Sequence, residues 1–594
     1  MGAKTRNAFI VSKALKTFVL AAVLTAAASQ LAHTADSMIV GHTVGADAVS
    51  AINLVLPLVE VLNCMGFLIC FGANAMCAQA IGSGNKEKTA KTFTSVIISV
   101  LTLGLFVSLL MSLFSPAIVD YISDEPRLDD MAVDYIRTYS MGGWLQMLSY
   151  GLCLMVATDG RPRVVTKAVV GGALLNGIVD VLLIIVLDMG IKGAALGSLS
   201  MFVANILILT YYLRKPQSSY RLMWPGKSFF SIFINNIKEG APVTVSNSMM
   251  AVTILLINHI VEIYLGADGL FLWSVCLQML LLSYVFIDGV IESLFAIGGV
   301  LVGERDLKGV QILVVQALII IAILVSLVIL FMWVPGLVGK LFGVADPVLL
   351  TELDRVLRIF ALMLVPFAVT QILLSTYQLV GHEKASLVTA ISQTVMMVAV
   401  VWLVAEAEGV ELWWGFAAAC VMVLLFQLSY TFTRSKIQSG THISPITMIP
   451  DEVKGYTFDR SVHFGNGDVY VALDELDKFL KAVGVPKDTL FELNLCCEEL
   501  MSNIDQYSES HASGRSFDLH VNISKDSIFI TIKDDGRPFD PIQAGKMADE
   551  RIGQAGHEHL GLRLVTNIIP DITYKYMYGQ NTVFISRKMK QDVQ

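Results

Sequence analysis

The chain has 594 residues, of which 55% are hydrophobic and only 15% are charged, with a formal net charge of −8. Its mean hydropathy is +0.66, and its apolar content exceeds the 45–50% or so that is typical of soluble domains. This composition excludes an ordinary soluble protein and indicates a polypeptide that lies largely in a lipid bilayer.

Charge is distributed unevenly along the chain. Close to half of the charged residues lie from Arg434 onward, whereas the preceding part is strongly apolar. The change in composition predicts a membrane domain followed by a water-exposed domain. We expect boundaries at 1–221 and 222–434 for two halves of the membrane part, 435–451 for a linker, and 452–594 for the C-terminal domain.

Twelve apolar stretches of about 20 residues, the length of a transmembrane helix, precede Arg434. The first runs past its Ala-rich positions to Asp36 and has eleven further spans behind it, so we expect a retained helix rather than a cleaved signal peptide. The fold class that follows is all-α with twelve spans. The expected spans lie near residues 15–38, 48–75, 92–116, 130–157, 164–188, 192–213, 233–262, 268–295, 308–334, 355–380, 385–405 and 411–432.

The charges of the connecting loops predict the orientation, because Lys and Arg favour the cytoplasmic side of a membrane. Alternate loops are basic, and the intervening ones are neutral or acidic. We therefore expect both termini, and with them the C-terminal domain, in the cytoplasm of a multi-pass cytoplasmic-membrane protein. The basic loops carry Lys86, Lys88 and Lys91, then Arg161, Arg163 and Lys167, then Arg214, Lys215, Arg221 and Lys227, then Arg305 and Lys308, then Lys384, and finally Arg434 and Lys436.

The membrane part contains an internal repeat with an offset of 221 residues. Gly45, Gly82 and Gly160 correspond to Gly266, Gly303 and Gly381, each within a similar loop. A repeat of six spans preserves orientation, so the two halves are expected as parallel lobes with a substrate cavity between them. This pattern favours a transporter over a receptor or a simple anchor.

Ionisable residues inside spans are costly and usually serve transported ions or protons. Asp36 lies in the first span and Asp180 in the fifth, and Asn176 precedes Asp180 by four residues, on the same helical face. Their oxygens suit a small hard cation or a shared proton. The alternative for each acid is that its carboxylate only lines a hydrated pore or lies at the end of a helix, without binding an ion.

Five segments resemble, in order, the signatures of the multidrug and toxic compound extrusion (MATE) transporters. The resemblance covers roughly residues 15–432 and implies an exporter with two six-helix lobes, driven by Na⁺ or H⁺ antiport. It also implies a cation site at Asp36, Asn176 and Asp180, with Ser198 at the position of a sixth-span threonine. The second half departs more from the family, and no site is carried over to it. The segments are residues 35–42 and 44–51, residues 159–163, residues 176–180 and residues 190–195.

The C-terminal domain shows helical periodicity over 473–483 and 490–507 and strand alternation over 517–523, 527–533 and 582–586. This mixture predicts an α/β domain. Three motifs in it carry chemistry together: Glu498 to Asn503 on the second helix, Asp534 to Pro541 after a strand, and His559 to Val565 at a glycine turn that enters a helix. A helix N-terminus of the last kind binds phosphate.

These motifs resemble the Bergerat nucleotide-binding fold, and most closely its anti-sigma-factor serine kinase branch. The resemblance implies Mg-ATP as cofactor, with Glu499 as catalytic carboxylate and Asn503 as Mg²⁺ ligand. It also implies nucleotide contacts at Asp534 and Gly536 for adenine and at Gly561 and Leu562 for phosphate, under a mobile lid at 542–558. His559 replaces a usual glycine, so ATP binding is expected and turnover is left open.

Three functional hypotheses follow, of which the third is that the nucleotide domain gates the transporter by binding ATP alone. In the first, the chain is a cation-coupled antiporter of drugs or other small organic compounds, with an ATP-binding regulatory or serine/threonine-kinase-like domain. In the second, the membrane part senses a ligand and the domain phosphorylates or sequesters a cytoplasmic protein, such as an anti-sigma-factor antagonist. The expected partners are the lipid bilayer, a small organic substrate and, in the second case, that protein; no nucleic-acid partner is expected.

Overall fold

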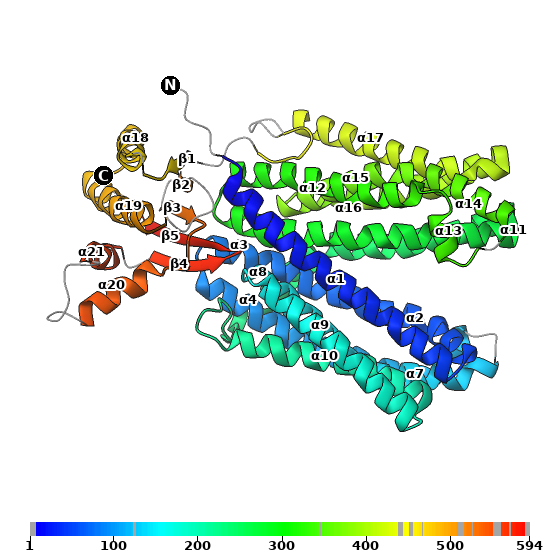
Figure 1. Ribbon diagram of the computed structural model, residues 1–594. Helices are drawn as coiled ribbons and strands as arrows, with labels where there is room; N and C mark the ends of the chain where they lie inside the picture. The colour runs from blue at the N-terminus through cyan, green and yellow to red at the C-terminus, as the bar shows by residue number, and fades with distance from the viewer. Residues whose placement is uncertain are drawn as a thin grey trace.

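The computed structural model describes residues 7–122, 126–344, 346–437, 444–450, 455–465, 467–508, 516–524, 527–550, 560–569 and 572–588. It contains two helical bundles and a small α/β domain at one end of them (Figure 1). We call the end that carries the α/β domain the domain end, and the opposite end the distal end.

The first bundle comprises helices α1 to α10. Short π-helical segments connect α2 to α3 and α4 to α5, so each of these two pairs forms one long span. A third π-helical segment extends α9. Helices α7 and α8 adjoin at Gly142. Their bounds are α1 Phe9–Thr43, α2 Ala46–Gly66, α3 Gly72–Gly82, α4 Lys86–Ser99, α5 Leu105–Leu113, α6 Ser115–Ile122, α7 Pro126–Met141, α8 Gly143–Thr158, α9 Pro162–Asp180 and α10 Gly190–Leu213.

The second bundle comprises helices α11 to α17. The backbone of α11 leaves the helical conformation at Gly266, with φ 61° and ψ −152°, so this helix is two spans joined at a glycine kink. A 3-10 turn joins α14 to α15. Their bounds are α11 Phe229–Gly303, α12 Leu307–Trp333, α13 Leu337–Leu341, α14 Pro347–Phe360, α15 Leu364–Leu379, α16 Glu383–Glu408 and α17 Trp413–Ile437.

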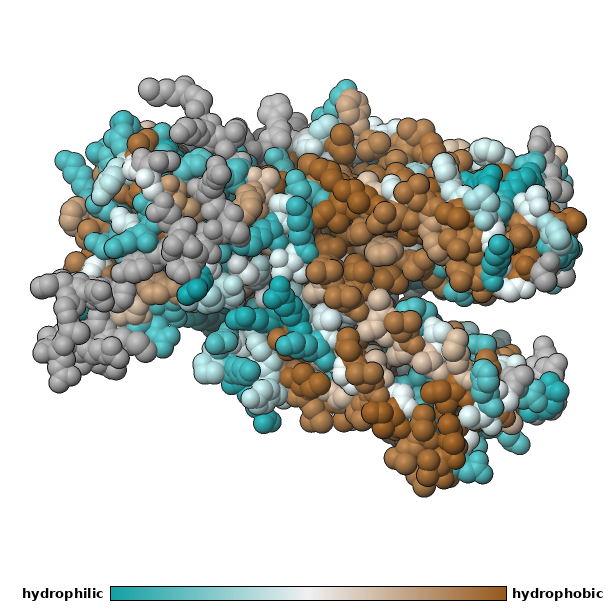
Figure 2. All heavy atoms as spheres, viewed as in Figure 1, coloured by the Kyte–Doolittle hydropathy of each residue, from teal (hydrophilic) through white to brown (hydrophobic). Residues whose placement is uncertain are grey.

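The expected membrane architecture is confirmed. Within the described residues, eleven helices are long and apolar enough to cross a membrane, and α8 is a shorter apolar helix. Together with α7, α8 occupies the place of the expected fourth span. On the face shown in Figure 2, apolar side chains cover the middle of both bundles, and hydrophilic ones gather at their ends.

The 221-residue repeat appears in the structure as a symmetric helix crossing at the domain end. A Cβ atom at Gly82 would lie 2.0 Å from the carbonyl oxygen of Val300, and one at Gly303 would lie 2.2 Å from that of Gln79. Residues 300 and 303 are the repeat partners of 79 and 82. Because any larger residue would overlap backbone, these glycines let α3 and α11 pack tightly and close the domain end between the bundles.

The bundles separate toward the distal end. The space-filling view shows a cleft between them that opens away from the α/β domain (Figure 2). The long helix α1 runs between the bundles and packs against both α9 and α11. The molecule is thus open at the distal end and closed at the domain end.

The α/β domain is a five-stranded antiparallel sheet with strand order β1-β2-β3-β5-β4. Helices α18, α19 and α21 share a hydrophobic core with one face of the sheet. The three strands and two helices expected from the sequence are confirmed, and β1 and β4 are additional. The bounds are β1 Tyr456–His463, α18 Asp468–Val483, α19 Lys487–Ser508, β2 Ser516–Ile523, β3 Ser527–Asp534, α20 Pro541–Glu550, α21 Leu560–Ile568, β4 Ile572–Met577 and β5 Gln580–Lys588.

The other face of the sheet lies against the domain end of the bundles. A cavity of about 270 Å³ there is lined by Phe529, Thr531 and Phe584 of the sheet and by Ser83 and Glu304 of the two bundles. The core face and the docked face are therefore opposite sides of one sheet.

Candidate functional sites

The structure brings the four predicted coupling residues of the first bundle together. Asn176 Nδ2 donates to Asp36 Oδ1 and, over 2.9 Å, to Asp180 Oδ2. Ser198 Oγ lies 3.5 Å from Asp36 Oδ2. Helices α1, α9 and α10 each contribute to this cluster, which is set between the helices of the bundle.

The cluster is buried and its hydrogen bonding is incomplete. Asp180 and Asn176 are 0% and 1% exposed. Asn176 Oδ1 and Asp180 Oδ1 have no hydrogen-bond partner among the described residues. Two buried carboxylates that share one amide nitrogen can both be anionic only if a cation binds between them; without a cation, one of them takes up a proton. The donor set therefore fits a small hard cation or a proton.

Two features of this cluster were not predicted from the sequence. A Cβ atom at Gly197 would lie only 1.7 Å from Asp180 Oδ1, so only glycine on α10 lets the carboxylate take its place. The buried Tyr135 of α7 contacts Ser198 through its hydroxyl. The sequence held no signal for either, since both depend on how separate helices pack.

The nucleotide motifs are partly brought together. A Cβ atom at Gly561 would lie 1.8 Å from Glu499 Oε2, so the N-terminal turn of α21 lies directly against the α19 carboxylate. Asn503 Nδ2 donates over 2.6 Å to the Glu499 carbonyl oxygen. This bond turns the amide oxygen away from the helix backbone, as a Mg²⁺ ligand requires, because hard cations prefer oxygen. The residues present fit Mg-ATP.

Asp534 ends β3 and is held in one orientation. Its Oδ1 accepts hydrogen bonds of 2.9 Å from the Gly536 backbone N–H and from Asn581 Nδ2. Asn581, on β5, was not among the predicted residues. Its role is invisible in the sequence because 46 residues separate it from Asp534 along the chain, and only strand pairing joins the two.

The remaining predicted residues of the domain lie as follows. The Leu562 side chain is buried in the domain core, which leaves its backbone as the part that can face a phosphate. Of the predicted lid, residues 542–550 belong to α20, and 551–558 lie outside the described residues, as does His559.

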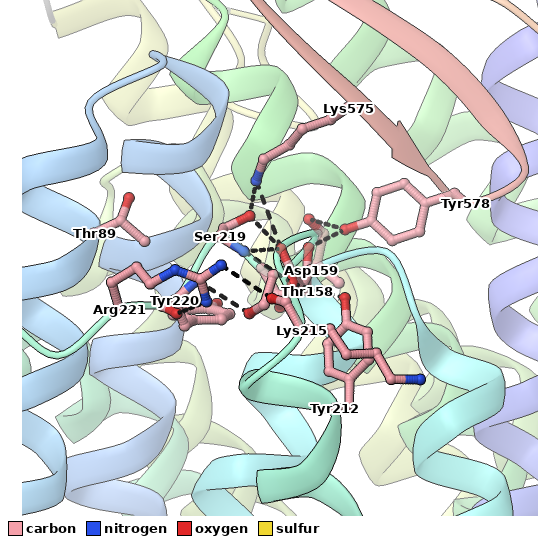
Figure 3. A network of polar contacts seen from close by, with 12 residues as sticks. Thr89, Thr158, Asp159, Tyr212, Lys215, Ser219, Tyr220, Arg221, Lys575 and Tyr578 are labelled. Atoms are coloured by element: carbon pink, nitrogen blue, oxygen red, sulfur yellow. Dashed lines mark hydrogen bonds and ion pairs between the residues drawn. The ribbon is translucent and has the colours of Figure 1, made fainter. Parts of the chain in front are cut away.

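The α/β domain contacts the first bundle through the loops that follow α8 and α10. Lys575 of β4 bonds to Ser219 and lies 3.5 Å from Asp159 Oδ1, and Asp159 also accepts from Tyr212 over 2.8 Å (Figure 3). Burial lowers the pKa of Lys575, while the Asp159 carboxylate opposes that change. The Arg161 guanidinium lies 5.5 Å from the centre of the Tyr576 ring.

The domain contacts the second bundle through the loop between α11 and α12. Lys533 Nζ lies 2.6 Å from Glu304 Oε2, and Lys308 Nζ lies 3.2 Å from Asp459 Oδ2. Burial raises the pKa of Glu304, and the nearby Lys533 charge opposes the rise. Burial alone would raise the pKa of Asp459, but the hydrogen bond and charge of His520 outweigh it and leave that pKa lowered.

Two family models match separate parts of the chain. The MatE model matches residues 21–182, and the histidine kinase-like ATPase domain model matches residues 466–587. Among curated proteins, a multidrug export protein MepA of Staphylococcus haemolyticus is 22% identical over 375 residues, covering 62% of this chain and 82% of the relative. A MepA of Staphylococcus aureus is 24% identical over 258 residues, covering 43% of this chain and 56% of the relative.

Solved structures share the fold of the membrane part. One described as the outward-facing conformation of a multidrug resistance MATE family transporter has a TM-score of 0.66 at 19% identity, covering 74% of this chain and 100% of that one. A crystal structure of MATE in the straight conformation has a TM-score of 0.65 at 20% identity, covering 72% and 98%. The membrane part of this chain is therefore similar to MATE transporters and carries the MatE match at residues 21–182, and its C-terminal part matches the histidine kinase-like ATPase domain.

Proposed function

We propose that the chain exports small organic compounds across the cytoplasmic membrane by alternating access, driven by entry of Na⁺ or H⁺. The observation that carries the proposal is the meeting of Asp36, Asn176, Asp180 and Ser198 in one buried cluster that needs a cation or proton. The names of the relatives, which are multidrug export proteins, support drugs as the exported class.

The orientation rests on the basic loops. Arg161 and Arg305 contact the C-terminal domain, and Lys86 lines the cavity beside it, so these loops share the domain end. Because basic loops favour the cytoplasmic side, the domain end faces the cytoplasm. The distal cleft then faces outward, and the coupling cluster takes up its ion from outside.

In this mechanism the Asp36 and Asp180 carboxylates repel each other when both are ionised. A proton or Na⁺ neutralises their mutual repulsion, and its loss restores that repulsion between α1 and α9. Asn176 holds one oxygen of each carboxylate, so it couples their positions. The cluster thereby converts ion occupancy into a change in how α1 packs, and α1 contacts both bundles.

The test is export from reconstituted vesicles with an imposed Na⁺ or H⁺ gradient. Asp36→Asn and Asp180→Asn should each abolish gradient-driven export, while Asp47→Asn, which alters a surface ion pair with Arg127, should leave it intact. Comparing the two gradients identifies the ion. Full export by Asp36→Asn would refute the coupling role.

We further propose that the C-terminal domain binds Mg-ATP and regulates the exporter. The placement of Glu499 beside Gly561 and the oriented Asp534 support nucleotide binding. Asn503 would hold the Mg²⁺ of bound Mg-ATP, the N-terminus of α21 would hold its phosphates, and Asp534 would accept a hydrogen bond from its adenine. Asn503→Ala should abolish Mg-ATP binding to the full-length protein, and unchanged affinity would refute the assignment. Phosphate transfer to a cytoplasmic protein, assayed alongside, would instead support the signalling function.

A further inference from the structure

The β4–β5 hairpin ends in a two-residue turn, Tyr578-Gly579, with φ of 53° and 79°. Positive φ at both positions defines a type I′ turn, in which Asn and Gly are the usual residues. A tyrosine in the left-handed region is uncommon and carries a conformational cost. Its side chain therefore has contacts that retain it there.

Those contacts join the two bundles. The Tyr578 hydroxyl lies 2.9 Å from the Thr158 carbonyl oxygen, in α8, and 3.1 Å from the Ala296 carbonyl oxygen, in α11. The first acceptor belongs to the first bundle and the second to the second bundle. Tyr578 is 5% exposed, so its single hydroxyl proton is shared between two buried carbonyls away from water.

The neighbours of Tyr578 fix the hairpin against the first bundle. Gly160 accepts a 3.3 Å hydrogen bond from the Tyr578 backbone N–H, and a Cβ atom at Gly160 would lie 2.6 Å from the Met577 Cα. Gln580 Nε2 donates to the Ile10 carbonyl oxygen of α1. Lys575 adds the contacts to Asp159 and Ser219 (Figure 3).

The same sheet is also fixed to the second bundle. The Glu304 and Lys533 side chains are 0% and 10% exposed, so this ion pair is buried. Arg305 lies 5.2 Å from the centre of the Phe529 ring and bonds over 3.3 Å to Asn522 Oδ1. A single rigid sheet therefore binds both bundles at the end where they are closed.

We propose that the C-terminal domain is a clamp whose hairpin tip holds the two bundles together at the cytoplasmic end and must withdraw before the exporter opens inward. Inward opening separates α8 from α11 at this end. Tyr578 cannot then keep its hydrogen bonds to both carbonyl oxygens, and the sheet cannot keep its ion pairs with both bundles. Docking thus stabilises the outward-open state selectively, and a change that weakens docking shifts the population inward.

The clamp is connected to the nucleotide motif. Asn581, which orients Asp534, follows Gln580 directly in β5, and Lys533 and Asp535 flank Asp534 and bind Glu304 and Lys13. The end of β3 that carries Asp534, the residue proposed to bind adenine, is thus also the end that binds both bundles. This proposal rests on the regulated export function proposed above, because it specifies how the domain acts on the exporter.

The test measures the separation of the bundles directly in full-length protein in lipid nanodiscs. Probes attached through non-natural amino acids at the exposed Arg214 and Lys384, one on each bundle, leave the eight native cysteines in place. Pulsed electron resonance then gives the distribution of probe distances. Tyr578→Phe removes the hydroxyl and should raise the ratio of inward-open to outward-open protein about fivefold, as expected for one net hydrogen bond.

Matched variants distinguish loss of the clamp from a general loss of protein stability. Tyr576→Phe is the same change two residues away and should leave the distribution unchanged. Tyr578→Phe combined with Lys533→Met weakens both attachments and should give a distinct inward-open population. A combined variant whose distances match the wild type would overturn the clamp. Because this readout needs no transport, it is independent of the Asp36→Asn export test, so the two proposals fail separately.

Discussion

Lys13 Nζ lies 2.6 Å from Asp535 Oδ2, and this ion pair joins the first transmembrane helix to the residue that follows Asp534. The Asp535 side chain is 0% exposed, and that of Lys13 is 31% exposed. An ionised acid that is buried requires charged or hydrogen-bonding partners. The membrane domain therefore supplies part of the environment that stabilises the nucleotide motif.

Replacing Lys13 by alanine should loosen β3. A charge-assisted hydrogen bond contributes about 1.5–3 kcal/mol, and its loss should speed backbone hydrogen exchange in β3 of the full-length protein. Lys16→Ala is the matched control, since Lys16 is an exposed lysine three residues further along α1. Equal exchange in the two variants would contradict a role for the Lys13–Asp535 pair.

Replacing Asn581 by alanine should weaken nucleotide binding. The Asn581 amide holds Asp534 Oδ1, and without it the carboxylate loses the fixed orientation that the proposed adenine contact requires. We expect affinity for a fluorescent ATP analogue to fall about tenfold, the equivalent of about 1.4 kcal/mol. Asn494→Ala removes a side chain that bonds to Asp477 instead and should bind as the wild type does. Normal affinity in Asn581→Ala would show that Asp534 needs no such support.

Replacing Gly197 by alanine should abolish the proposed ion-coupled export without unfolding the protein. The new methyl group would lie 1.7 Å from the present position of Asp180 Oδ1 and must displace that carboxylate. The proposed gradient-driven export should be lost to the extent expected for Asp180→Asn. Gly177→Ala is the control, because no atom lies within 4 Å of a Cβ atom there. Retained export in Gly197→Ala would show that coupling does not depend on the position of the Asp180 carboxylate.

Asp468 should make the C-terminal domain sensitive to acid. Burial raises the pKa of Asp468, but the His463 backbone N–H and the Arg460 charge outweigh it and leave the pKa lowered. A lowered folded-state pKa adds stability that is present above the unfolded pKa of about 3.9 and lost as the pH falls through the folded value.

Asp468→Asn should therefore destabilise the domain at pH 7 by about 2 kcal/mol, and its effect should shrink as the pH falls through the lowered folded-state pKa of Asp468. Urea unfolding of the full-length protein, followed by hydrogen exchange in β1, measures this difference. Asp474→Asn alters an exposed pair with Lys478 and is the control. A difference that persists unchanged in acid would contradict the assignment of the lowered pKa.

Much of the membrane fold was predictable because the bilayer imposes a strong local rule. Spans must be long, apolar and helical, so their number and approximate bounds can be predicted from composition alone. The repeat glycines were also visible, and one pair of them, Gly82 and Gly303, lies where α3 and α11 cross. Asp36 and Asp180 could be identified because charge in an apolar run is rare, and Asn176 because it lies four residues before Asp180 on the same helical face. Their meeting is a property of the folded bundle.

The C-terminal motifs were predictable for a different reason, since each is a short contiguous pattern. Strand β4 was missed because Ile572–Met577 alternates weakly, and Asn581 was missed because its partner lies on another strand. The Lys533–Glu304 and Lys575–Asp159 pairs each join residues more than 220 positions apart. No local periodicity encodes such pairs.

The sequence by itself determined that a twelve-span membrane domain precedes a nucleotide-type α/β domain, because hydropathy, loop charge and short motifs are local properties. Only the tertiary structure decided that the two are docked, with Tyr578 between α8 and α11. The physical reason is that docking depends on surface complementarity between distant segments. That complementarity exists only after each domain has folded.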